Sequence, residues 1–264
     1  MPKVTINDLL EMKAKGEKIA CLTAYDATFS RLISECGIEI ILVGDSLGNV
    51  IQGHKTTLQV TAENMAYHTA CVAKTEPHSL VITDLPFMSY PTSEKAIKTA
   101  AVVMQNGAEM VKVEGGQWLS CIISDLVERG IPVCGHLGLT PQSFHMLGGY
   151  KVQGRSEADA AVIFSDALTI QKAGASLLVL ECVPESLASD ISAKLKIPVI
   201  GIGAGPNTDG QVLVLHDMLG LSPNSPRFSR NFLQDKDSVA AALQNFLRSV
   251  KEGEFPDNSN WYNY

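Results

Sequence analysis

Short apolar runs alternate along the chain with segments in which apolar residues recur at helical spacing. A run of a few residues that is apolar throughout is typical of a strand buried on both faces, as in a parallel sheet. Amphipathic segments between such runs are typical of the helices that connect parallel strands. The pattern therefore predicts strands at residues 19–25, 38–44, 80–84, 110–114, 131–136, 176–182, 198–203 and 212–216.

The segments between these runs predict the connecting helices. Thr61 opens one amphipathic segment and Ser93 lies at the start of another, and both residue types favour helix amino termini. The same spacing predicts helices at 27–36, 93–106, 117–129, 157–173, 184–195 and 238–251. Four glycines precede predicted strands, where a left-handed residue commonly ends a helix: Gly37, Gly107, Gly130 and Gly174.

Eight strands that alternate with helices fit a closed (β/α)8 barrel or an open doubly wound sheet. In an open sheet the ligand groups gather at one switch point, whereas here charged residues end most of the predicted strands. This distribution favours the closed TIM barrel, in which the loops after all strands face one pocket. No segment resembles a linker, so we expect one α/β barrel domain over residues 1–264, with a C-terminal helix and tail at about 222–264.

Composition narrows the possible partners and the compartment. Hydrophobic residues make up 45% and charged residues 19% of the chain, which is enough for a folded core. A formal net charge of -7 argues against binding to the phosphate backbone of nucleic acids. No signal-peptide pattern and no apolar stretch near the roughly 20 residues of a membrane helix are present, so we expect a cytoplasmic protein. Six scattered cysteines without a CxxC pair predict buried structural thiols.

Three predicted strands end in carboxylates: Asp45, Asp84 and Glu114. Oxygen ligands of this kind suit Mg²⁺ or Mn²⁺ better than zinc or copper. Three negative charges at one barrel mouth would repel one another without a cation. The pattern predicts a hard divalent ion there, although an Asp at such a junction can instead cap a helix.

The remaining polar strand ends suggest chemistry on a 2-oxo acid, because a chelated ion can stabilise its enolate. Glu181 follows an apolar run and is the candidate general base, or alternatively a carboxylate paired with a basic residue at the pocket edge. Lys112 shares a strand face with Glu114 and could bind a substrate anion or form a Schiff base. His136 could donate to a substrate oxygen or be a satisfied core histidine.

Two connections and one glycine-rich segment have less specific signals. The long segments 45–60 and 137–156 are candidate lids, or surface loops that pack against a neighbouring subunit. The glycines of segment 201–205 follow a strand but lack the GxGxxG spacing. They indicate close backbone approach at a barrel end rather than a phosphate site.

Seven stretches of the chain together resemble one known family. They are Leu-Val-Gly-Asp45-Ser46-Leu-Gly, Asp84-Leu-Pro-Phe-Met, Met-Val-Lys112-Val-Glu114-Gly-Gly, Pro-Val-Cys-Gly-His136-Leu-Gly-Leu-Thr-Pro-Gln, Gly-Gly-Tyr150-Lys-Val-Gln-Gly154-Arg, Leu-Glu181-Cys-Val-Pro and Ile-Gly-Ile-Gly-Ala-Gly. In this order they resemble the ketopantoate hydroxymethyltransferase family. The resemblance implies a barrel of the phosphoenolpyruvate/pyruvate-type superfamily. It also implies transfer of a hydroxymethyl group from 5,10-methylenetetrahydrofolate to 3-methyl-2-oxobutanoate, which gives 2-dehydropantoate in pantothenate and coenzyme A biosynthesis.

The resemblance also implies roles for individual residues and an assembly. Mg²⁺ would be held by the three strand-end carboxylates and would stabilise an enolate, and Glu181 would take the C3 proton of the substrate. The assembly would be a homo-oligomer, a homodecamer. Two alternatives remain: a metal-dependent carbon-carbon lyase of the isocitrate type, and a binding or scaffold protein with a barrel but no catalysis. The substrate would contact Asp45, Ser46, Asp84, Lys112 and His136.

Overall fold

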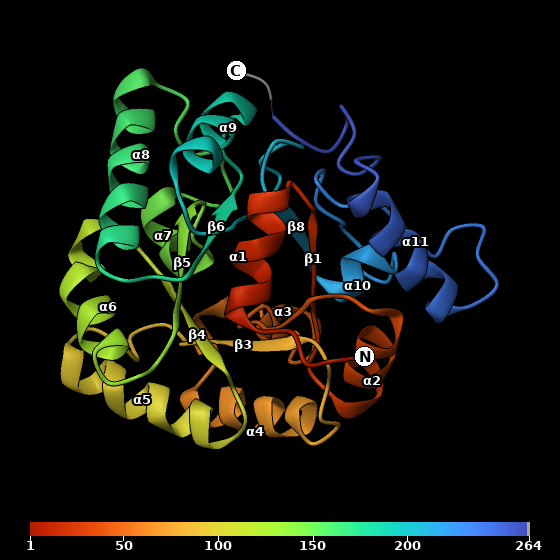
Figure 1. The fold of residues 1–264 in the computed structure, drawn as a ribbon, viewed down its shortest axis with the longest axis horizontal. Coiled ribbons are helices and arrows are strands. Elements are labelled where there is room, and N and C mark those ends of the chain that lie inside the picture. The colour runs from red at the N-terminus through yellow and green to blue at the C-terminus, as the bar shows by residue number, and fades with distance from the viewer. Residues whose placement is uncertain (263–264) are drawn as a thin grey trace.

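A ring of parallel strands forms the centre of the computed structural model, which describes residues 1–262 (Figure 1). Each strand pairs with the next, and β8 pairs with β1, which closes the barrel. The predicted TIM barrel is confirmed, and each predicted strand is present, although the last ends at Leu213 and its final residues enter a short helix. The strands are β1 (Ile19–Thr23), β2 (Ile40–Val43), β3 (Leu80–Asp84), β4 (Met110–Glu114), β5 (Val133–Gly138), β6 (Leu177–Glu181), β7 (Val199–Ile202) and β8 (Gly210–Leu213).

The predicted helices cover the outside of the barrel, and α4, α5, α6 and α8 follow one another around it in Figure 1. The segment predicted as one helix at 117–129 begins with a 3-10 turn, η2 (Gln117–Leu119), before α6. The predicted glycine ends are confirmed, since all four glycines have φ between +79° and +106°. The outer helices are α2 (Ala27–Cys36), α4 (Ala62–Ala73), α5 (Ser93–Gln105), α6 (Ser120–Val127), α8 (Glu157–Lys172), α9 (Glu185–Lys194) and α11 (Val239–Lys251).

One helix that the sequence pattern did not predict, α1 (Ile6–Lys15), crosses the ring in Figure 1. It begins with a capping box, in which the Thr5 hydroxyl accepts from the Asp8 N–H and the Asp8 carboxylate accepts from the Thr5 N–H. Leu9 is 1% exposed and packs among the first inward-facing residues of the strands. The helix therefore closes the amino end of the barrel.

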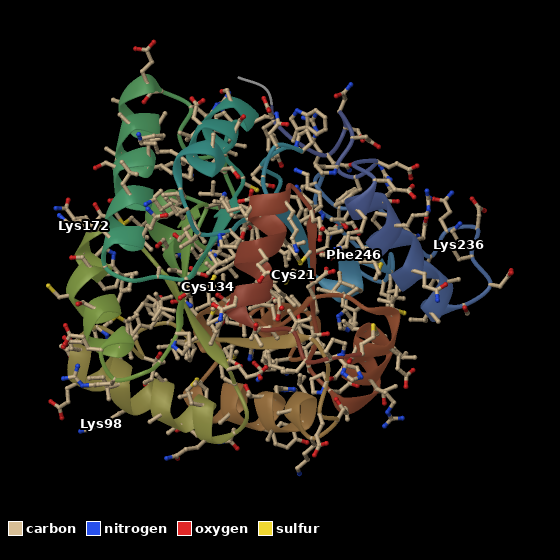
Figure 2. All side chains as sticks on the ribbon, in the orientation of Figure 1. Cys21, Lys98, Cys134, Lys172, Lys236 and Phe246 are labelled. Atoms are coloured by element: carbon tan, nitrogen blue, oxygen red, sulfur yellow. The ribbon has the colours of Figure 1, made fainter. Side chains whose placement is uncertain are left out.

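Alternation along the strands separates two cores. Inward side chains such as Cys21 and Cys134 pack inside the barrel beside α1, while outward side chains pack against the surrounding helices (Figure 2). All six cysteines are free, and Cys182 is also buried. The prediction of buried thiols holds only in part for Cys36 and Cys71, which are half-buried, and is wrong for Cys121, which is exposed. Its neighbours on α6 are buried, but successive helical residues point in different directions.

The C-terminal segment returns along the barrel. Helix α11 packs beside α2 and β1 and carries Phe246, which is labelled in Figure 2. The Phe246 ring contacts Phe232 edge-on and Phe255 at a tilt. The last two residues of the predicted tail, 263–264, lie outside the described residues. No helix within residues 1–262 has both the length and the apolar character that crossing a bilayer requires.

Candidate active site

The carboxyl ends of β3 to β6 bring the predicted charged side chains into one cluster. Parallel pairing places Asp84 opposite Lys112, and Glu114 opposite His136. All four side chains are buried, because they point into the barrel above the apolar layer. Glu181 lies at the rim, where its side chain is 14% exposed. The barrel thus places acids and bases in one water-poor volume.

Asp45 and Ser46 join the cluster from the loop after β2. The Asp45 N–H donates to Asp84 Oδ2 at 2.9 Å, so the two acidic strand ends are directly linked. Ser46 Oγ lies 2.8 Å from the Tyr25 hydroxyl. By contrast, Asp26 caps α2 by accepting from the Thr28 and Phe29 N–H groups. The helix-cap interpretation therefore describes Asp26, whereas Asp45 and Asp84 bond to each other.

Lys112 lies among the carboxylates. Its Nζ is 2.7 Å from Asp84 Oδ1 and 3.7 Å from Glu114 Oε1. Burial lowers the pKa of Lys112, but the surrounding carboxylates of Asp84, Glu114 and Asp45 outweigh burial and raise it. The amine is therefore a charged ammonium. A Schiff base requires a neutral amine, so the geometry favours anion binding over covalent attack.

His136 connects the buried cluster to the rim. Its Nδ1 lies 3.3 Å from Glu114 Oε1, and its Nε2 lies 3.2 Å from Glu181 Oε2. Burial and Lys112, which is 3.3 Å away, lower the pKa of His136, but the two carboxylates raise it to about 9. An imidazolium therefore bridges the two acids at neutral pH. Glu181 thus has the basic partner that the pocket-edge interpretation expected, and the contact also fixes the direction of its carboxylate.

The acidic residues fit a hard cation by their chemistry. Burial and repulsion by Asp84 and Glu114 raise the pKa of Asp45 well above its usual range. Glu114 Oε1 and Asp84 Oδ1 are buried and have ion-pair contacts without an aligned hydrogen bond. Within residues 1–262, no three His, Cys, Asp or Glu side chains form a preassembled ligand group. The carboxylate oxygens therefore have unused bonding capacity, and the negative charge of ionised Asp45 is not balanced by the cluster. Both properties are compatible with a bound divalent ion.

The structure adds two residues that sequence reasoning did not assign. Gln142 donates from its backbone N–H to Glu114 Oε2 and from Nε2 to Asp45 Oδ2, both at 2.9 Å. The Tyr90 hydroxyl donates to Gln142 Oε1 at 2.6 Å and accepts from the Glu114 N–H. Gln142 lies on η3 (Pro141–Ser143), so these bonds attach the long 137–156 connection to the barrel mouth. Gln142 ends one of the seven stretches singled out in the sequence, whereas no sequence pattern marked Tyr90.

The connections around the mouth have short helices of their own. The 45–60 segment contains α3 (Leu47–Val50) and η1 (Thr57–Gln59), and the 137–156 segment contains α7 (Phe144–Leu147) after η3. Helix α10 (Leu215–Met218) follows β8. The glycines of segment 201–205 make the close approaches that the sequence predicted: a Cβ on Gly205 would lie 2.4 Å from Glu185 Cγ.

Comparison with known proteins gives this site a family context. The family model described as ketopantoate hydroxymethyltransferase matches residues 3–258. A 3-methyl-2-oxobutanoate hydroxymethyltransferase of Pseudomonas putida is 53% identical over 264 residues, with 99% of each chain covered. One of Colwellia psychrerythraea is 54% identical over 257 residues, with 97% of each chain covered.

Solved structures at low identity share the barrel fold. A putative phosphonomutase from Burkholderia cenocepacia has a TM-score of 0.65 at 15% identity, covering 81% of this chain and 94% of that one. Phosphonopyruvate hydrolase in complex with oxalate and Mg²⁺ has a TM-score of 0.61 at 10% identity, covering 80% of each chain. A 2,3-dimethylmalate lyase of the PEP mutase/isocitrate lyase superfamily has a TM-score of 0.57 at 16% identity, covering 80% of this chain and 81% of that one.

Proposed function

The chain belongs to the ketopantoate hydroxymethyltransferase family, and we propose that it transfers a hydroxymethyl group from 5,10-methylenetetrahydrofolate to 3-methyl-2-oxobutanoate to form 2-dehydropantoate. The chain is thus a transferase enzyme of the pantothenate pathway. The observation that carries the proposal is the charged cluster at the carboxyl end of the barrel. There, the Lys112 ammonium and the His136 imidazolium lie between buried carboxylates and the rim carboxylate of Glu181.

The cluster needs a further cation before it can accept an anionic 2-oxo acid. We propose Mg²⁺, with Asp45, Asp84 and Glu114 as the residues that would hold it directly or through water. Bound Mg²⁺ would supply positive charge that stabilises an enolate. Two observations support a hard ion: the donors are oxygens, and the phosphonopyruvate hydrolase with the same fold was solved with Mg²⁺ and oxalate.

Side chains of the cluster would bind the substrate and remove its proton. Lys112 and Ser46 would bind oxygen atoms of the substrate, and His136 would keep a positive charge beside Lys112. Glu181 would remove the C3 proton, because it lies at the rim and is oriented by His136 Nε2. The enolate would then attack the methylene carbon of the folate, both C–N bonds to that carbon would break, water would supply the hydroxyl group, and tetrahydrofolate would leave. Proton removal and carbon-carbon bond formation would therefore take place on the same side of the barrel.

The proposal includes a homo-oligomer, a homodecamer, in the cytoplasm. Large apolar side chains that are exposed on one chain, such as Met146 and Val162, support association between copies. Light scattering on the purified protein measures the subunit number. A monomer at micromolar concentration would contradict this part of the proposal.

One assay tests substrate, donor and ion together. Purified protein is mixed with 3-methyl-2-oxobutanoate, 5,10-methylenetetrahydrofolate and Mg²⁺, and 2-dehydropantoate is followed by mass spectrometry. We expect product only when both substrates are present, with loss of turnover in EDTA and recovery when excess Mg²⁺ is added. Turnover unaffected by EDTA would refute the metal, and cleavage of an isocitrate-like substrate without folate would favour the lyase alternative.

A further inference from the structure

An aromatic pocket lies directly beside the charged cluster. It has a volume of about 220 Å³, and its apolar wall is formed by Phe87, Met88, Tyr90, Pro91 and Trp118. A cavity of about 150 Å³ holds benzene, so this pocket has room for more than one six-membered ring. Relying on the proposed function for the identity of the co-substrate, we propose that this pocket binds the pterin ring of the reduced folate.

Trp118 and Tyr90 form a stacked pair with one open side. Their ring planes differ by 8° and their centroids are 6.2 Å apart. Tyr90 is buried, whereas Trp118 is 58% exposed, so the pair is closed towards the barrel and open towards solvent. A flat heterocycle gains most from stacking on an aromatic surface that is already fixed.

The position of the indole is fixed by the backbone beneath it. Gly115, directly after β4, has φ +141°, and a Cβ there would lie 2.5 Å from Trp118 Nε1. Only a glycine allows the indole to approach the backbone so closely. Trp118 is therefore part of a preformed platform on η2, which follows the strand that carries Lys112 and Glu114.

The polar side of the pocket is shared with the charged cluster. Glu114 and Gln142 line the pocket and bond to each other, and Gln142 also bonds to Asp45. The Tyr90 hydroxyl bonds to Gln142, which connects the aromatic wall to the same network. A pterin has apolar faces and an edge of amide and amino groups, so it matches a pocket with aromatic walls and one polar side. Glu114 is in turn connected through His136 to Glu181, the proposed base.

The first experiment compares Trp118→Leu with the wild-type enzyme in steady-state kinetics. We expect KM for 5,10-methylenetetrahydrofolate to rise about tenfold, the order that one lost ring-stacking contact is worth. KM for 3-methyl-2-oxobutanoate should be unchanged, and so should folate-independent exchange of its C3 hydrogen in deuterated water. The matched control is Tyr67→Leu on α4, where an equally exposed aromatic ring, 66% exposed, lies outside the pocket.

A binding experiment separates the pocket from turnover. Trp118 and Trp261 are the two tryptophans of the chain. Tetrahydrofolate should quench the fluorescence of a Trp261→Phe protein, and Trp118→Leu should bind tetrahydrofolate about tenfold more weakly by calorimetry. Unchanged folate KM and affinity in Trp118→Leu would overturn the pocket assignment. A changed subunit number with unchanged folate affinity would also overturn it, by showing that another copy covers this surface.

Failure of the proposed function has a different signature. Wild-type protein that exchanges no C3 hydrogen and forms no product with any folate would refute the transferase proposal itself. If the wild-type protein is active and Trp118→Leu keeps a normal KM for the folate, only the pocket assignment is refuted.

Discussion

The two ends of the barrel interior are equally buried but chemically opposite. At the amino end, Leu9 is 1% exposed and packs on apolar side chains such as Met110. At the carboxyl end, Lys112 is 3% exposed and lies among carboxylates. Met110 and Lys112 are on the same strand and face the same interior, two residues apart. The next inward-facing residue along the strand therefore belongs to a charged layer and no longer to the apolar one.

This difference separates stability from function. Burial of apolar surface at the amino end stabilises the fold by roughly 25 cal/mol per Å². Buried charges at the carboxyl end lose hydration, and their pairing with one another offsets that loss only in part. We therefore expect substitutions at the amino end to change mainly the free energy of unfolding, and substitutions at the carboxyl end to change mainly turnover.

The largest effect is expected from Glu181→Gln at the carboxyl end. If Glu181 is the base, loss of its carboxylate should lower kcat by about 10²–10⁴-fold, because that is the usual contribution of a positioned base. Exchange of the C3 hydrogen of 3-methyl-2-oxobutanoate, followed by NMR in deuterated water, should fall to the same extent. The melting temperature should change little, since Glu181 lies at the rim. Near-wild-type exchange in this variant would exclude Glu181 as the base.

Leu9→Ala tests the amino end. Removing this side chain should lower the free energy of unfolding by about 2–5 kcal/mol, because it leaves a cavity against the barrel floor. Urea unfolding followed by circular dichroism measures this loss. The neighbouring Leu10→Ala is the matched control, since Leu10 is 36% exposed. The kcat of folded Leu9→Ala should remain within about twofold of wild type, and a much larger fall would show that the two ends are coupled.

Strand positions in both layers were predictable from the sequence, but the closing helix was not. The strands are mostly apolar and only four to six residues long, whereas a buried helix would need a longer run. Helix α1 precedes the first strand and so lies outside the alternation of strands and helices, and only Leu9 is buried along its length. Its capping box at Thr5 and Asp8 was present in the sequence and could have located its start.

The charged cluster was predictable where a polar residue ends or directly follows an apolar run, and unpredictable farther along the loops. Asp84, Lys112 and Glu114 were found because a charge at the end of an apolar run is conspicuous. Gln142 and Tyr90 were not found, since their partners depend on how the loops cross the barrel mouth. Nor could the sequence show that Lys112 pairs with Asp84, because that contact depends on strand register.

The pH dependence of stability should reveal the charged layer. The pKa of His136 is about 9 in the folded protein, compared with an ordinary value of 6.5. Its stabilising contribution is fully present below pH 6.5 and is lost as the pH rises through about 9, because a raised pKa means that folding favours the protonated form. The loss is at most about 3 kcal/mol. Urea unfolding of metal-free protein across this range measures it, and His136→Gln should flatten the profile. An identical slope in the variant would assign the effect to another group.

The smallest expected effect comes from the cap of the closing helix. Thr5→Ala removes one side of the capping box and should lower the free energy of unfolding by about 1 kcal/mol. Thr61→Ala is the matched control, because it removes the same kind of cap from α4 on the outside of the barrel. The two variants should lose similar stability, but only Thr5→Ala should speed amide hydrogen exchange in α1 and in the first residues of the strands beneath it. If both variants speed exchange there equally, the amino end is stabilised by the whole barrel, including the outer helices, and not by α1 alone.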